Sequence, residues 1–277
     1  MPKTRLDLLL VERGLAESRS LAQALIMAGQ VRLGGQVEFK PSAQVAPDAE
    51  VTLEAGPRFV SRGGEKLEAA LQAFPIRVEG RVCADVGAST GGFSDCLLQH
   101  GAAKVYAIDV GKGLLHWKLR TDARVTVMEE TNARFVAALP EPVELVTIDA
   151  SFISLRILLP VVKGWLPPYP PPVSEKRGGD RGGVLALIKP QFEAGRQIMA
   201  KNRGVIRDPA VHRSVLKDVL DFAMAQGFAV RGLLRSPVLG PKGNVEFLAW
   251  LRAGVDETLA PDALIEGVFQ GRDEFQE

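Results

Sequence analysis

Apolar residues recur along most of the chain in short runs that are separated by segments with helical spacing. Seven runs are suited to strands, at 82–87, 104–109, 125–129, 143–149, 184–189, 229–236 and 244–251. Helical spacing is found at 93–100, 152–165 and 211–226. This alternation predicts an α/β fold with a doubly wound, mostly parallel sheet that is covered on both faces. Residues 236–244 are too few for a crossover helix, so the last strand is predicted to be antiparallel to its predecessor.

The first 57 residues follow a different pattern, which predicts a small α+β unit. Its predicted elements are a helix over 6–14, a second helix that Ser18 or Ser20 caps and Gly29 ends, a hairpin around Gly34 and Gly35, and a strand over 49–55. A unit of this size is typical of a docking module and has little room for chemistry.

The two patterns also predict the domain boundaries. We expect a small domain over 1–57, a linker over 58–61, a large α/β domain over 62–252 and a C-terminal tail over 253–277. Inside the large domain, residues 167–183 are rich in proline, glycine and charge, which predicts a flexible insertion. The tail is acidic, and we expect it to be peripheral.

The composition is ordinary for a globular protein, with 46% hydrophobic and 24% charged residues and a net charge of +1 over 277 residues. Net charge therefore gives no sign of nucleic-acid binding. The two cysteines and three histidines lack metal-ligand spacing, so no metal site is predicted. Charges interrupt the first apolar residues, and no run reaches the ~18 apolar residues of a membrane span. We therefore expect a cytoplasmic protein without a signal peptide or membrane contact.

A glycine-rich turn follows the first strand of the predicted sheet, in the stretch CADVGASTGGFSD over 83–95. A phosphate-binding loop of the GxxxxGK[ST] type requires a lysine where Phe93 stands. A dinucleotide fingerprint requires a second glycine where Ser89 stands. S-adenosylmethionine (SAM) carries no phosphate and requires only a close approach of the backbone. SAM is therefore the ligand that this turn fits best.

Carboxylates after two strands complete the predicted SAM site. Asp85 is expected to pair with the ammonium group of SAM, directly or through water, while Gly87 lets the chain pass beside the methionine portion. Asp109, at the end of the second strand, is expected to accept both ribose hydroxyls. The alternative is a turn of structural glycines and a helix cap, which the position of Asp109 disfavours. The predicted SAM-binding residues are Asp85, Gly87, Ser89, Thr90, Gly91, Gly92, Phe93, Asp109, Val110, Asn132 and Asp149, with 129–135 flanking the adenine.

The residues at the ends of the later strands favour a hydroxyl as the methyl acceptor. Methyltransferases that act on exocyclic amines commonly carry a Pro-Pro-aromatic motif after the fourth strand, and no such motif follows Asp149. Methylation of a pyrimidine carbon requires a thiolate in the site, and neither cysteine is placed to attack one. A hydroxyl requires a base, and Lys189 closes an apolar strand at the edge where ligands bind. We expect Lys189 to take the hydroxyl proton and Asp149 to orient Lys189. Lys66 and Glu246 are expected to position the acceptor sugar.

These four charged residues resemble the Lys-Asp-Lys-Glu tetrad of the FtsJ/RrmJ-like RNA 2′-O-methyltransferases. The resemblance narrows to the TlyA family, which also carries an older haemolysin label. The matching strings are FVSRGGEKL (59–67), DVGASTGGFSDCLLQHGA (85–102), HWKLRTDARV (116–125), ASFISL (150–155), KPQFE (189–193) and GPKGNVEFLAWL (240–251). The resemblance implies a Rossmann-like SAM-dependent methyltransferase domain behind an RNA-binding module of the ribosomal-protein S-four type. It further implies methyl transfer to the ribose 2′-hydroxyl of cytidine in ribosomal RNA, with rRNA or ribosomal subunits as the partner.

Charge in the small domain is nearly balanced, with six basic and seven acidic residues over 1–57. RNA binding there would require the basic residues to share one face. Phe39 is the single aromatic residue of this segment, so we expect recognition of backbone and shape in preference to stacking. The predicted RNA-binding residues are Lys3, Arg5, Arg19, Arg32, Lys40 and Arg62, with Arg5, Arg19 and Lys40 as the leading candidates for phosphate contacts.

Three other functions stay open at this point. They are SAM-dependent methylation of another hydroxyl or RNA nucleotide, a membrane-active haemolysin, and a non-catalytic ribosome assembly factor. The lack of a spanning run and of a strongly amphipathic cationic helix disfavours the haemolysin. The intact tetrad disfavours the inert assembly factor.

Overall fold

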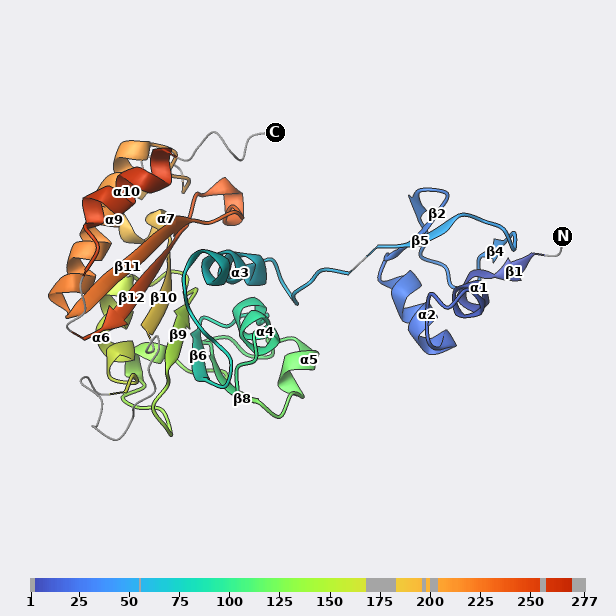
Figure 1. Cartoon of the computed structure of the whole chain (residues 1–277), viewed down its shortest axis with the longest axis horizontal. Coiled ribbons are helices and arrows are strands. Elements are labelled where there is room, and N and C mark those ends of the chain that lie inside the picture. The colour runs from blue at the N-terminus through green and yellow to red at the C-terminus, as the bar shows by residue number, and fades with distance from the viewer. Residues whose placement is uncertain are drawn as a thin grey trace. The chain divides into compact units, whose positions relative to one another are not determined.

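The computed structural model of the chain describes residues 3–54, 56–167, 183–195, 198–199, 204–254 and 258–270. Residues 168–182 of the predicted insertion therefore lie outside the described residues. The chain divides into two compact units, Met1–Arg58 and Phe59–Glu277, which are drawn in Figure 1. Among the described helices, none has both the length and the apolar character that crossing a membrane requires.

The N-terminal unit contains the two helices and the hairpin that the sequence predicted. Ser18, and not Ser20, caps the second helix, because its hydroxyl accepts a hydrogen bond from the Leu21 backbone N–H at 3.2 Å. Gly34 and Gly35 have φ of +56° and +81°, as a primed hairpin turn requires. The elements are β1 (Thr4–Arg5), α1 (Leu6–Glu12), α2 (Arg19–Met27), β2 (Val31–Leu33), β3 (Gln36–Val37), β4 (Gln44–Val45) and β5 (Val51–Leu53).

Two small sheets and a compact core hold this unit together. β1 pairs with β4, and β2 pairs with both β3 and β5, all antiparallel. The core is formed by apolar side chains of both helices and of β2 and β4. Its fully buried members include Leu6, Leu10, Ala22, Ile26 and Val31.

A seven-stranded sheet forms the centre of the second unit, with the strand order β11-β12-β10-β9-β6-β7-β8. The predicted parallel sheet is confirmed, and so is the antiparallel last strand, since β12 runs against both β10 and β11. The strands are β6 (Val82–Val86), β7 (Lys104–Ile108), β8 (Val125–Met128), β9 (Leu145–Ile148), β10 (Gly183–Ile188), β11 (Phe228–Arg235) and β12 (Phe247–Ala253).

Helices cover both faces of this sheet, as Figure 1 shows. Alternate residues of β10 separate the two cores: Val184, Ala186 and Ile188 join one, while Leu185 and Leu187 join the other. The first core lies under α6, α9 and α10, and the second lies under α3 and α4. The helices are α3 (Gly63–Ala73), α4 (Gly92–Gln99), α5 (Trp117–Arg120), α6 (Leu155–Lys163), α7 (Pro190–Glu193), α9 (Pro209–Ala225) and α10 (Pro261–Gln270), with short 3₁₀ turns η1 (Ala133–Phe135) and η2 (Pro241–Gly243).

The C-terminal region is less peripheral than its acidic composition suggested. Helix α10 packs against α9 and β11. Its Ile265 and Phe269, four residues apart on one helical face, are 4% and 8% exposed and belong to the main core. The expectation of a peripheral tail is therefore wrong for residues 261–270.

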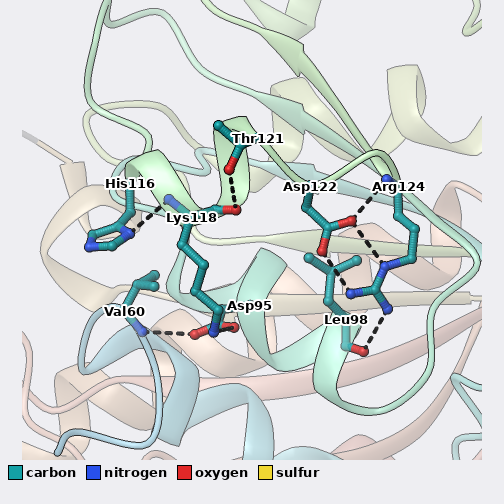
Figure 2. Close-up of polar contacts among 8 residues, drawn as sticks. All are labelled: Val60, Asp95, Leu98, His116, Lys118, Thr121, Asp122 and Arg124. Carbon is teal, nitrogen blue, oxygen red and sulfur yellow. Dashed lines mark hydrogen bonds and ion pairs between the residues drawn. The ribbon is translucent and has the colours of Figure 1, made fainter. Parts of the chain in front are cut away.

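Polar contacts fasten the beginning of the second unit to α4 and α5. The buried Asp95 of α4 accepts a hydrogen bond from the Val60 backbone N–H at 2.9 Å and pairs with Lys118 Nζ at 3.1 Å (Figure 2). His116 Nδ1 accepts from the Lys118 backbone N–H at 3.2 Å, which fixes the first turn of α5. The chain just before α3 is thus held against the helix that follows the glycine-rich turn.

Candidate active site

The carboxyl edge of the sheet is hollowed into a cavity of about 320 Å³. This volume lies at the lower end of the range for small-molecule pockets. Its walls come from the start of α3, the turn after β6, the ends of β9 and β10, and the loop before β12. The lining residues are Ser61, Arg62, Gly63, Lys66, Gly87, Ala88, Ser89, Thr90, Gly92, Phe93, Asp149, Ser151, Lys189, Val238, Leu239 and Gly240.

Sheet register explains why distant residues meet at this cavity. Val86 pairs with Ile148, so Gly87 and Asp149 leave the sheet side by side. Ile188 pairs with Phe247, so Lys189 stands beside Glu246, which precedes the antiparallel β12. The strand order alone therefore brings three of the four predicted charged residues to one edge.

The glycine-rich turn passes close to the end of β9. Gly87 has φ of +83°, and a Cβ there would lie 2.8 Å from the Asp149 carbonyl oxygen. Gly87 is therefore required for the backbone packing of this turn against the end of β9. Ser89 has φ of +49°, and both Ser89 and Thr90 are exposed in the cavity wall. Gly91 is buried at the N-terminus of α4 and does not line the cavity.

The sequence predicted that Asp85 pairs with the ammonium group of SAM directly or through water, and the structure places its side chain away from the cavity lining. Its side chain is 0% exposed and does not line the cavity. The hydroxyls of Ser94 and Thr147 donate to its two oxygens at 2.7 and 3.0 Å. Burial raises the pKa of Asp85 to about 7, against the lowering effect of these hydrogen bonds. Asp85 thus fixes the start of α4 relative to β6 and β9.

Asp109 links the ends of β6 and β7. Its carboxylate accepts from the backbone N–H groups of Ser89 at 2.8 Å and Gly111 at 2.7 Å. Two accepted bonds leave a carboxylate with further acceptor sites, so Asp109 retains the capacity to bind hydroxyls. Its backbone oxygen accepts from Thr131 N–H, which brings Asn132 to the same side of the sheet. Val110 is 67% exposed beside it. Asp109, Val110 and Asn132 lie outside the cavity lining.

Lys189 and Asp149 form an ion pair at the cavity. Lys189 Nζ lies 2.6 Å from Asp149 Oδ1, 3.3 Å from the Asp149 carbonyl oxygen and 3.0 Å from Ser151 Oγ. The lysine is 7% exposed, and both charged residues line the cavity. The ammonium is therefore held at the wall by a carboxylate, a carbonyl and a hydroxyl, which leaves it fixed in place.

Lys66 and Glu246 form a second, deeper ion pair. Lys66 Nζ donates to Glu246 Oε2 at 2.6 Å, and Gln191 Nε2 donates to Glu246 Oε1 at 3.1 Å. Glu246 is 0% exposed, so Lys66 presents the pair to the cavity while Glu246 lies behind it. A Cβ on Gly240 would lie 2.1 Å from Glu246 Oε1, which shows how closely the loop covers this carboxylate.

Several residues around the cavity were not singled out by the sequence patterns. Ser151 contacts Lys189, and Val238 and Leu239 contribute apolar side chains to the cavity lining. Phe152 is 91% exposed and has φ of +63°, a backbone conformation that is unusual for a bulky residue. Its ring lies 5.0 Å from that of Phe192. The positive φ and the exposed ring mark Phe152 as a candidate functional residue, and neither property can be read from the sequence.

The predicted RNA-binding residues divide into two groups. Arg5 and Arg19 both pair with the buried Asp7, at 2.8 and 3.1 Å, and Arg32 pairs with Glu54. These three arginines therefore stabilise their own unit. The other predicted RNA-binding residues are Lys3 and Lys40, which are exposed in the N-terminal unit, and Arg62, which is exposed at the cavity.

Two domain families match the chain with the geometry just described. Residues 59–253 match the FtsJ-like methyltransferase family, and residues 4–51 match the S4 domain. A protein of Bacillus subtilis strain 168, YqxC, provisionally named an rRNA methyltransferase, is 48% identical over 90% of this chain and 85% of its own length.

Two further relatives are similar over nearly their whole length. The 16S/23S rRNA (cytidine-2′-O)-methyltransferase TlyA of Mycobacterium tuberculosis is 42% identical over 96% of both chains. A solved structure from Streptococcus thermophilus, provisionally titled a hemolysin, is 41% identical over 99% of this chain and 98% of its own, with a TM-score of 0.71.

Proposed function

The chain belongs to the FtsJ-like methyltransferase family, and from this premise we propose that it transfers a methyl group from SAM to the ribose 2′-hydroxyl of cytidine in ribosomal RNA. The relative TlyA, whose name gives this reaction, is similar along 96% of the chain. The observation that carries the proposal is the meeting of two lysine–carboxylate pairs at one cavity beside the glycine-rich turn.

The residues around the cavity fit SAM. The turn from Gly87 to Phe93 offers backbone at close range, and Asp109 retains acceptor sites for ribose hydroxyls. Val110 and Leu114, 67% and 47% exposed, offer apolar surface near Asp109 for an adenine ring. When bound, SAM supplies a methyl group on a positively charged sulfur, which leaves as a neutral thioether.

We assign the role of base to Lys189. Its neutral amine accepts the 2′-hydroxyl proton as the oxygen–methyl bond forms, which leaves an ammonium ion. Asp149, 2.6 Å away, pairs with that ammonium, so the observed ion pair is the arrangement that follows proton transfer. Ser151 Oγ, at 3.0 Å, restricts the amine to one position on the cavity wall. Proximity and orientation of this kind supply much of the rate of a group transfer.

Lys66 is proposed to position the acceptor sugar. Its Nζ reaches the cavity from α3 and is held there by the fully buried Glu246. A buried carboxylate without a cation is costly, so Lys66 and Glu246 depend on each other. Glu246 therefore acts through Lys66 and not by touching the substrate.

RNA is proposed to reach the cavity across Arg62 and Phe152. Arg62 is an exposed cation in the cavity wall. Phe152, four residues after β9 ends at Ile148, presents its ring to solvent. Aromatic rings that face solvent beside a site are typical platforms for unstacked bases. The S4 domain is proposed to bind folded rRNA. An rRNA substrate is consistent with the cytoplasmic location expected from the sequence.

The proposal is tested by incubating the full chain with methyl-labelled SAM and separate small and large ribosomal subunits. Label should appear in rRNA, at a cytidine whose modified ribose resists alkaline cleavage and blocks reverse transcription at low nucleotide concentration. Label on a base, or on another nucleotide, would favour a different methyltransferase reaction. No label in any RNA, with SAM binding intact, would favour a non-catalytic assembly factor.

A further inference from the structure

The interface between α3 and α4 contains a polar cluster that the reaction does not use. The two helices run side by side, and a Cβ on Gly92 would lie 2.8 Å from the Gly64 backbone nitrogen. Four residues after Gly64 and Gly92, Glu68 of α3 contacts Cys96 of α4. Four residues after Cys96, His100 contacts the same Glu68 carboxylate. The facing residues are therefore Gly64, Glu68 and Gln72 on α3, and Gly92, Cys96 and His100, spaced by four, on α4 and at its C-terminal end.

Three potential metal ligands meet in this cluster. Glu68 Oε2 lies 2.6 Å from His100 Nε2 and 3.7 Å from Cys96 Sγ, and all three donor atoms lie within 4.8 Å of one another. Among the described residues, this is the single group of three such side chains with donors so close together. Glu68 and Cys96 are buried, while the His100 side chain is 32% exposed. A small ion can therefore enter from the histidine side.

We propose that Glu68, Cys96 and His100 bind a divalent transition-metal ion, best matched by Zn²⁺, between α3 and α4. Thiolate, imidazole and carboxylate are the donors that Zn²⁺ accepts, and three protein ligands plus one water complete a tetrahedral shell. Bond lengths of about 2.0–2.3 Å separate neighbouring donors in such a shell by about 3.3–3.7 Å. The Cys96–Glu68 distance already fits, and the His100–Glu68 distance opens by about 1 Å when the ion replaces their shared proton.

The second contact of Glu68 supports a binding role. Gln72 Nε2 donates to Glu68 Oε1 at 2.8 Å, which leaves Oε2 directed at Cys96 and His100. Such outer hydrogen bonds orient metal ligands and contribute to affinity. Binding requires the Cys96 thiol proton, and any proton shared by His100 and Glu68, to pass to solvent. The alternative is a metal-free ion pair of Glu68 and His100 that buries Cys96 as a small side chain.

The spacing of residues in the sequence does not reveal this site, because its ligands come from two helices. Cys96 and His100 are a helical i, i+4 pair, but Glu68 lies 28 residues earlier. The ion would cross-link α3 and α4. α3 carries Lys66 into the cavity, and α4 begins with the cavity residues Gly92 and Phe93. A metal at this interface would therefore hold together two walls of the pocket without touching the substrate.

Cobalt(II) spectroscopy tests the proposal on the full chain, purified without a histidine tag and freed of metal by chelation. Because the protein has two cysteines, a thiolate-to-cobalt absorption band reports on Cys96 or Cys83 alone. We expect one Co²⁺ per chain, the charge-transfer band, and displacement of cobalt by Zn²⁺. Cys96→Ala should abolish the band and lower Zn²⁺ affinity more than about 100-fold, and Gln72→Ala should lower it about 10-fold to 100-fold.

Matched variants separate the site from the rest of the chain. Cys83 lies in β6, where burial raises the pKa of its thiol to about 12, so Cys83→Ala should leave the band unchanged. His100→Gln removes a half-exposed ligand with little effect on folding and should lower affinity as Cys96→Ala does, whereas His116→Gln should not. Absence of a one-to-one cobalt complex, or a band that survives Cys96→Ala, would overturn the proposal. These measurements require neither SAM nor RNA, so they are independent of the methyltransferase reaction.

Discussion

Among the described aspartates, Asp7 of the N-terminal unit and Asp85 of the second unit are both 0% exposed, and their charges are compensated in opposite ways. In the N-terminal unit, Asp7 is 0% exposed and accepts from Arg5 at 2.8 Å, Arg19 at 3.1 Å and Gln23 at 2.8 Å. The Arg5 hydrogen bond is the largest of the effects that hold the pKa of Asp7 well below its usual range. Here two arginines are used to stabilise a small fold.

Among the described residues of the second unit, no cation pairs with Asp85. Asp85 is equally buried, but Ser94 and Thr147 supply only neutral hydroxyl donors, and burial raises the pKa of Asp85 to about 7. Two lysines of this unit, Lys66 and Lys189, pair instead with Glu246 and Asp149 at the cavity. Two arginines thus stabilise the fold around Asp7, whereas Lys66 and Lys189 of the second unit form their ion pairs at the cavity.

The largest effect should come from the lysine at the cavity wall. Replacing Lys189 with alanine should lower kcat about 10²-fold to 10⁴-fold, because the base is lost, while SAM affinity stays the same. Single-turnover transfer from labelled SAM and calorimetric titration of SAM measure the two quantities. Lys217→Ala, in an exposed ion pair of α9, is the matched control and should leave both unchanged. Normal transfer by Lys189→Ala would show that this amine is not the base.

The pH dependence of unfolding sharpens the contrast between the two aspartates. Because the folded-state pKa of Asp85 is raised from 3.8 to about 7, its contribution to stability is fully present below pH 3.8 and is lost as pH rises through about 7. Asp85→Asn removes this loss, which amounts to on the order of 4 kcal/mol for about three pKa units. The variant's unfolding free energy should therefore change less than the parent's between pH 4 and pH 8.

Tryptophan fluorescence measures this difference in the correct unit. Trp117, Trp165 and Trp250 are the protein's three tryptophans, and all lie in the second unit. Urea midpoints followed at their emission therefore report on the surroundings of Asp85 and not on Asp7. Parallel pH profiles of parent and Asp85→Asn would contradict the assignment of a raised pKa to this carboxyl.

A smaller effect is expected when the charge of the other aspartate is removed. Asp7→Asn leaves Arg5 and Arg19 without their buried anion, and should destabilise the N-terminal unit by about 2 kcal/mol, discounted because both arginines are partly exposed. Hydrogen exchange over residues 3–54 should accelerate, while the tryptophan transition stays in place. Asp48→Asn, at an exposed position, is the control. Unchanged exchange would show that the arginines do not depend on Asp7.

The fold was predictable where burial leaves a simple pattern. Strands covered on both faces read as continuous apolar runs, so all seven were predicted within a few residues. Helix α3 was not predicted, because Gly63 and Gly64 at its start have low helix propensity. Helix α10 was missed because its apolar face is short, with Ile265 and Phe269 as its buried residues.

The site was predictable as far as it depends on the ends of strands. Asp149, Lys189 and Glu246 follow or precede runs that are plainly strands, so their common edge could be expected. Side-chain pairs between elements that are far apart in the sequence could not be predicted, because they depend on packing that leaves no periodic pattern in the sequence. The sequence therefore did not show that Asp7 forms ion pairs with Arg5 and Arg19, or that Glu68 contacts His100.

The smallest predicted effect concerns which basic residues of the N-terminal unit are available to RNA. Arg32 is already paired with Glu54, whereas within the described part of the chain no ion pair involves the Lys40 side chain, which is exposed. If Lys40 contacts phosphate, Lys40→Ala should weaken binding to ribosomal subunits and lower the slope of log K against log salt by about 0.8.

Arg32→Ala should change that slope less, because Glu54 has neutralised most of the charge that RNA would meet. The double variant Arg32→Ala with Glu54→Ala should bind as Arg32→Ala does or slightly more tightly, since it also removes an anion from the same surface. Filter binding over a salt series separates these cases. Equal slopes for Lys40→Ala and the parent would remove Lys40 from the RNA contact. A larger slope change for Arg32→Ala would show that RNA displaces Glu54, and that the small unit's ion pairs serve recognition as well as folding.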